Sequence, residues 1–167
     1  MRIVHAIVTV FVFVLLQMLV SPKIAIGDIA PDFILLLVAY FAIQRKPQRA
    51  AVAGFVIGLG QDLFNPELLG LNALTKSLVG YGFGLVGSKA EQDHPLLLMA
   101  LLGVAAVAHD FVYLLFFSGL HLGKFIILWT TVSIPSALYT ALTGLVVYKI
   151  AATLGSKAVR TLGKARS

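Results

Sequence analysis

Ionisable side chains interrupt an otherwise apolar sequence at five places. A charged group inside a hydrophobic helix is costly unless it finds a partner, so it needs a reason to be there. Such groups mark an ion or proton pathway, a substrate site, a contact with a partner, or a structural charge pair. We treat these residues as a candidate buried polar network: Asp32, Asp62, Lys76, His109 and Asp110.

The remaining reactive residues do not form a catalytic or metal-binding pattern. The chain has no cysteine, which excludes thiol nucleophiles and thiolate zinc sites. Its four histidines lie far apart without metal-ligand spacing, and on a helix His109 projects about 100° away from Asp110. The glycine-rich stretch 80–84 lacks the strand, turn and lysine of a phosphate loop. We therefore predict no enzyme activity, no cofactor and no metal site.

The composition places these residues in a membrane protein. The chain is 59% hydrophobic and only 12% charged, whereas a soluble domain is about one quarter charged. The formal charge of +6 comes from basic residues that lie beside apolar stretches. That placement indicates membrane topology and contact with anionic lipids rather than nucleic acid. We expect one transmembrane domain over residues 1–167.

Apolar stretches of near-membrane length predict an all-α polytopic fold with six transmembrane helices. A bilayer core about 30 Å thick requires roughly 20 apolar residues per helix, and fewer in a packed bundle. Five spans are the alternative, if the hairpin Ala51–Gly87 with its turn at 65–67 dips in and out. Pro135 is expected to kink the last span. The predicted spans are Ile3–Val20, Ile29–Ile43, Ala50–Phe64, Leu68–Gly87, Pro95–Phe117 and Phe125–Leu154.

The basic residues orient this topology. With both termini cytoplasmic, ten of the thirteen lysines and arginines lie inside, Lys23 and Lys124 lie outside, and Lys76 lies within a span. This distribution follows the positive-inside rule. Residues 155–167 then form a basic cytoplasmic tail that anchors the topology, with a lipid or partner contact as the alternative.

The same topology places all five network residues in the outer half of the membrane. Helical side chains lean toward the N-terminus of their own helix, so Asp62 and Lys76 lean toward each other on antiparallel neighbours. We predict a direct contact between them, with Asp32 and Asp110 as further partners. A substrate or ion site and a partner contact remain alternatives, although a relay needs polar groups across the whole depth.

Small residues supply the close packing that such a hairpin needs. Two small-xxx-small motifs lie on the faces that carry Asp62 and Lys76, which favours an internal hairpin over a dimer seam. A second stripe of small, weakly polar residues, which includes Ser133 and Thr140, predicts internal packing in the last span or an interface with another membrane protein. The hairpin motifs are formed by Gly54, Gly58, Gly80 and Gly84.

Several short motifs over about residues 28–88 resemble the rod shape-determining MreD family. This resemblance implies a bacterial inner-membrane scaffold of the cell-elongation (rod) complex, which takes part in cell shape and peptidoglycan synthesis. It implies binding to MreC and, indirectly, to the peptidoglycan synthase and MreB. The motifs are Pro31-Asp32, Gly54-Phe55-x-x-Gly58-Leu59-x-x-Asp62-Leu63, Gly70-Leu71-Asn72-Ala73-Leu74 and Gly80-Tyr81.

The resemblance also implies a fold similar to the S components of energy-coupling-factor transporters, which bind vitamins in an outward-facing pocket. An alternative function is therefore a small-molecule-binding transport subunit. S components often carry an Ala-x-x-x-Ala pair on the first helix, where this chain has Ala6 alone. That difference, together with the MreD-like motifs, favours the scaffold.

Overall fold

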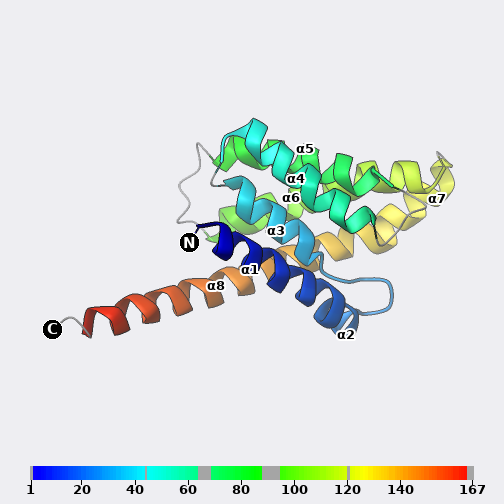
Figure 1. The fold of residues 1–167 in the computed structure, drawn as a ribbon. Coiled ribbons are helices and arrows are strands. Elements are labelled where there is room, and N and C mark those ends of the chain that lie inside the picture. Colours follow the sequence, from blue (N-terminus) through cyan, green and yellow to red (C-terminus); the bar gives the residue numbers. More distant parts are fainter. Residues whose placement is uncertain (1, 44, 64–68, 88–94, 120, 165–167) are drawn as a thin grey trace.

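The chain forms an all-α bundle in which both chain ends lie at one end and α7 lies at the other (Figure 1). The structure is a computed structural model, and it describes residues 2–43, 45–63, 69–87, 95–119 and 121–164. The expected turn at 65–67 lies outside the described residues. The elements are α1 (Arg2–Leu15), η1 (Leu16–Val20), α2 (Ser21–Ile24), α3 (Phe33–Ile43), α4 (Pro47–Asp62), α5 (Leu71–Gly87), α6 (Pro95–Phe117), α7 (Leu122–Leu128), η3 (Trp129–Ser133) and α8 (Ile134–Lys164).

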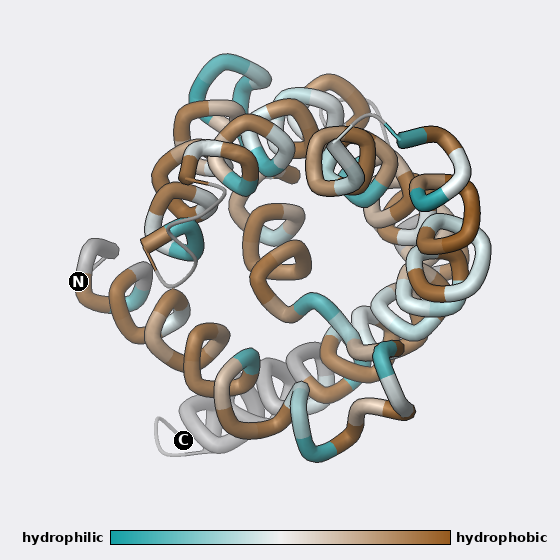
Figure 2. The backbone as a smooth tube through the Cα atoms, turned by 90° about the vertical axis from the view of Figure 1, so that its right-hand side faces the viewer, coloured by the Kyte–Doolittle hydropathy of each residue, from teal (hydrophilic) through white to brown (hydrophobic). Residues whose placement is uncertain are grey.

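α3 occupies the middle of the bundle. Its sequence is apolar on every side, which is typical of a helix with no face toward solvent, and each residue from Phe33 to Ala39 is buried. Figure 2 shows an apolar helix surrounded by the others, and α3 contacts α1, α4, α5, α6 and α8. The second predicted span begins later than expected, because Pro31 and Asp32 precede the helix instead of opening it.

Two wide helical turns precede prolines. The N–H of Ser21 bonds the carbonyl of Leu16 at the end of η1, and the N–H of Ile134 bonds the carbonyl of Trp129 at the end of η3. In both cases the next residue is a proline, which has no N–H and cannot continue the α-helical ladder. The disturbance expected at Pro135 is therefore a π turn over Trp129–Ser133 that joins α7 to α8.

α4 and α5 pack closely enough for their backbones to touch. A Cβ on Gly58 would collide with the carbonyl of Asn72, and one on Gly80 would lie 2.5 Å from the carbonyl oxygen of Ala50. Gly54 and Gly84 meet the opposite backbone in the same way. These glycines let the two helices approach as small-residue faces do in membrane proteins, and this approach fixes the position of Lys76.

Three helical stretches among the described residues are long and apolar enough to cross a membrane. They are Ile7–Ile24, Met99–Phe117 and Leu122–Ile150, and α3 is a shorter apolar helix. The 16 residues of α4 and the 17 of α5 fall below the roughly 20 that a lone span needs. The chain is thus a multi-pass membrane protein by length and composition.

Candidate functional site

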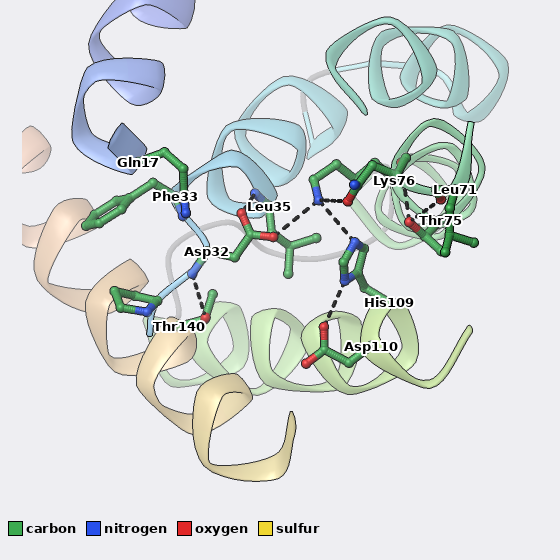
Figure 3. A network of polar contacts seen from close by, with 12 residues as sticks. Gln17, Asp32, Phe33, Leu35, Leu71, Thr75, Lys76, His109, Asp110 and Thr140 are labelled. Carbon is green, nitrogen blue, oxygen red and sulfur yellow. Dashed lines mark hydrogen bonds and ion pairs between the residues drawn. The ribbon is translucent and has the colours of Figure 1, made fainter. Parts of the chain in front are cut away.

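Lys76 is the centre of a buried polar network. Its side chain is fully buried, and its Nζ lies 3.2 Å from Asp32 Oδ2, 3.3 Å from Asn72 Oδ1 and 3.0 Å from His109 Nε2 (Figure 3). An ammonium group has three N–H donors and no acceptor. The three neighbours therefore use its full donor capacity, provided that His109 Nε2 accepts.

This geometry assigns the tautomer of His109. Because Nε2 accepts from Lys76, the ring is neutral and carries its proton on Nδ1. Nδ1 lies 2.9 Å from Asp110 Oδ1 and donates to it. The other Asp110 oxygen accepts from the Ser133 hydroxyl at 2.7 Å. The chain of hydrogen bonds thus runs from Lys76 on α5 through His109 to the Asp110 carboxylate on α6. Ser133 of η3 donates to the same carboxylate.

Asp32 caps the start of a helix and also pairs with the Lys76 ammonium. Its Oδ1 accepts the N–H of Leu35 at 2.8 Å, the usual bond of an N-cap residue at the start of α3. Its Oδ2 faces Lys76, and its own N–H donates to the hydroxyl of Thr140 in α8 at 3.0 Å. One residue therefore ties α3 to α5 and α8.

The direct contact predicted between Asp62 and Lys76 is wrong. Asp62, which is fully buried, accepts the backbone N–H groups of Gly70, Asn72 and Ala73 at 2.9–3.1 Å. Asp62 ends α4 beside the N-terminus of α5, whose free N–H groups and dipole attract a carboxylate. Lys76 lies further along α5, and its long side chain reaches Asp32 and His109 instead.

Asn72 connects Asp62 to the rest of the network. Its backbone N–H bonds Asp62 Oδ1, and its side-chain oxygen accepts from Lys76. All five predicted residues are thereby joined, four through direct side-chain contacts and Asp62 through Asn72.

Two polar residues, one in η1 and one in α2, were not predicted as members. Gln17 Oε1 accepts the N–H of Phe33 at 2.7 Å, and the Ser21 hydroxyl donates to the carbonyl of Pro31 at 2.9 Å. They hold the extended segment that carries Asp32, where backbone groups have no helical partner. A lone glutamine in an apolar helix was the signal that could have identified Gln17.

A cavity of about 230 Å³ opens beside the network between α3, α6 and the final helix. Asp32 and Asp110 line it, and their side chains are 26% and 27% exposed. Ser133, Ser136 and Thr140 contribute hydroxyl groups, and the rest of the lining is mostly apolar. The cavity therefore has an apolar lining with polar groups from several elements, two of which are carboxylates.

The charges of the network do not balance. With His109 neutral, Lys76 is one cation among three carboxylates. Asp32 pairs with Lys76, and the helix N-terminus of α5 stabilises Asp62. Asp110 receives hydrogen bonds from His109 and Ser133 but faces no cation among the described residues. The same part of the chain contains no group of three or more residues suited to a metal ion.

The comparisons with known proteins give one match. A family described as rod shape-determining protein MreD matches residues 1–156. No curated protein and no solved structure matches the chain.

Proposed function

The chain belongs to the rod shape-determining MreD family, and from this premise we propose that it is a scaffold subunit of the rod complex that binds MreC. Through MreC it associates with the peptidoglycan synthase and with MreB filaments. Membership makes the chain a non-enzymatic membrane protein of cell-shape determination. Its function is therefore one of binding and organisation.

The polar network supports a scaffold because it joins helices that are distant in sequence. Lys76 on α5 contacts Asp32 before α3 and His109 on α6, while Asp110 contacts Ser133 before α8. Truncating a single member of a buried charge pair costs about 3–5 kcal/mol. Such a network gives the outer end of the bundle one defined shape, which a binding partner can recognise.

The observation that carries the proposed binding site is the unbalanced charge of Asp110. This carboxylate borders a cavity and is 27% exposed. A lysine or arginine of MreC would supply the missing cation, and an ion pair in such a partly desolvated site is screened less by salt than one on an open surface. Ser136 and Thr140 offer further hydrogen-bonding groups beside it.

We infer six membrane crossings in the bacterial inner membrane, with both termini cytoplasmic and the cavity on the outer side. Figure 1 supports this arrangement, since both chain ends lie at the end of the bundle opposite α7. The short helices α3, α4 and α5 cross as neighbours, because each packs against the other two. The chain is one transmembrane domain over 1–167, with a basic tail from 155.

Co-purification from native membranes tests the proposal. Affinity-tagged wild-type protein is expected to recover MreC, with the synthase and MreB following only when MreC is present. Asp110→Asn removes the charge at nearly constant shape, so we expect at least severalfold less MreC at an unchanged membrane level. Asp28→Asn, an exposed carboxylate in the loop before α3, is the matched control.

Different results would contradict the scaffold function and the cavity as its binding site. Wild-type protein that recovers no MreC would contradict the scaffold. Equal recovery by Asp110→Asn and wild type would contradict the cavity as the binding site while leaving the scaffold in place.

A small-molecule-binding subunit similar to the S components is the second candidate, and the cavity is the observation that favours it. At about 230 Å³ it lies below the usual ligand pocket of roughly 300–1,000 Å³. Recovery of a transporter ATPase module instead of MreC in the same experiment would support this candidate.

A further inference from the structure

The boundary between α5 and α6 combines a charge-dependent contact with an open apolar groove. The Lys76 ammonium donates to His109 Nε2 across this boundary at 3.0 Å. Next to it lies a cavity of about 320 Å³ whose lining includes Thr75 and Ala108, the chain neighbours of these two residues. The boundary is thus joined by a hydrogen bond at one point and loosely packed beside it.

The two helices pack closely behind the groove, where Val79 and Phe83 of α5 belong to the same buried cluster as Leu102 and Ala106 of α6, and the groove itself is open. From α5 it is lined by residues such as Leu78 and Gly82, and from α6 by Val104 and Ala105. A Cβ on Gly82 would meet nothing within 4 Å. At the mouth of the groove, where Leu78 and Val104 are exposed, separation of the helices would therefore break few close contacts, because the facing atoms are already apart.

The contact requires a neutral His109. When both ring nitrogens carry protons, Nε2–H points at the Lys76 ammonium and has no acceptor. Two cations would then lie 3.0 Å apart in a buried site, where like charges repel strongly. A proton can reach Nε2 when the lysine side chain moves off the ring, and it then prevents the lysine from returning.

Among the charged groups around His109, the carboxylates favour the charged ring, and the Lys76 ammonium opposes it until the lysine side chain moves away. Asp110 bonds Nδ1 and stabilises the charged ring, while Tyr113 of α6 stacks on the ring at 6.0 Å between centroids. Asp32 before α3 holds Lys76 on the other side, and Asp62 of α4 is occupied by the α5 backbone. Protonation therefore leaves two ion pairs, Lys76–Asp32 and His109–Asp110, that lie on opposite sides of the α5–α6 boundary.

We propose that His109 is a proton-dependent latch between α5 and α6: the neutral ring holds the helices together, and the protonated ring releases them at the outer end. A free histidine gains its proton near neutral pH; burial and the Lys76 ammonium oppose that step at His109, so the release requires more acid than a free histidine needs. The proposal concerns the shape of the bundle and does not depend on the identity of its partner.

Spin labels across the groove test the latch directly. Because the chain contains no cysteine, Leu78→Cys and Val104→Cys introduce two unique attachment sites. Both positions line the groove and are 54% and 68% exposed. The doubly labelled full-length protein in lipid nanodiscs is examined by electron paramagnetic resonance between about pH 8 and pH 5. We expect dipolar broadening to weaken on acidification as the labels separate.

Two variants make the result specific. His109→Gln keeps an acceptor and a donor but does not titrate, so its spectrum is expected to stay constant with pH. His121→Gln changes an exposed histidine at the start of α7 and should keep the wild-type response. If His109→Gln does not give the wild-type spectrum at about pH 8, His109→Asn replaces it. A wild-type spectrum that does not change, or one that changes equally in the non-titrating variant, would overturn the latch.

Discussion

Lys76 Nζ lies 3.2 Å from the carboxylate of Asp32, although 44 residues separate them in the chain. The pair joins the end of an extended segment to the second turn of α5. Lys76 is completely buried, whereas the Asp32 side chain is 26% exposed. The cation is therefore enclosed by the protein, and its partner borders the cavity.

Removing the cation should destabilise the bundle. Lys76→Met preserves the length of the side chain but leaves Asp32 without a charge partner, and removing one member of a buried pair costs about 3–5 kcal/mol. We expect a lower midpoint of thermal unfolding in detergent and reduced membrane levels. Lys23→Met, at an exposed position in α2, should leave both unchanged. Unfolding of Lys76→Met at the wild-type temperature would contradict the structural role of the pair.

Replacing Asp62 should loosen the start of α5. In Asp62→Asn a single carbonyl oxygen faces the N–H groups of Gly70, Asn72 and Ala73, and each unsatisfied buried group costs about 1–3 kcal/mol. Amide hydrogen exchange is expected to increase in peptides that cover 69–76. Asp28→Asn serves as the control. Unchanged exchange in this segment would show that the carboxylate does not hold the helix start.

A single methyl group at Gly58 should separate α4 from α5. In Gly58→Ala the new Cβ collides with the backbone of Asn72 and Ala73, and forced overpacking costs about 1–3 kcal/mol or more. Gly60→Ala is the matched control on the same helix, since its Cβ would meet nothing within 4 Å. We expect the unfolding midpoint to fall for the first variant and to stay constant or rise for the second. The reverse order would contradict the close approach of the helices.

Gln17 should matter more than its place in an apolar helix suggests. Gln17→Leu removes the acceptor of the Phe33 N–H, and an unsatisfied buried donor costs about 1–3 kcal/mol. Because Phe33 opens α3 beside Asp32, faster amide exchange is expected at the start of α3 together with a lower unfolding midpoint. Gln48→Leu, an exposed position in α4, should change stability by less than about 0.5 kcal/mol. Equal effects of the two substitutions on stability would contradict the proposed role of Gln17.

Much of the architecture could be predicted from the sequence. Hydrophobic length predicted a helical membrane protein, and α6 begins and ends at the predicted Pro95 and Phe117. Glycine spacing predicted the faces on which α4 and α5 meet, because small residues at helical spacing produce a backbone surface whatever lies opposite. The motifs around Asp32 and Asp62 resembled the MreD family, which then matched residues 1–156.

The pairings were decided by the tertiary structure alone. The sequence placed Asp62 and Lys76 on neighbouring helices, but Lys76 can reach several acceptors, and only helix rotation and crossing decide which of them lies within about 3 Å. Asp62 instead meets the N-terminus of α5, where the N–H groups of Gly70, Asn72 and Ala73 bond its carboxylate. Gln17 was missed because its partner is a backbone N–H, which every residue except proline offers equally. Sequence thus identified five polar residues of the network, and the packing of the helices determined what each of them bonds.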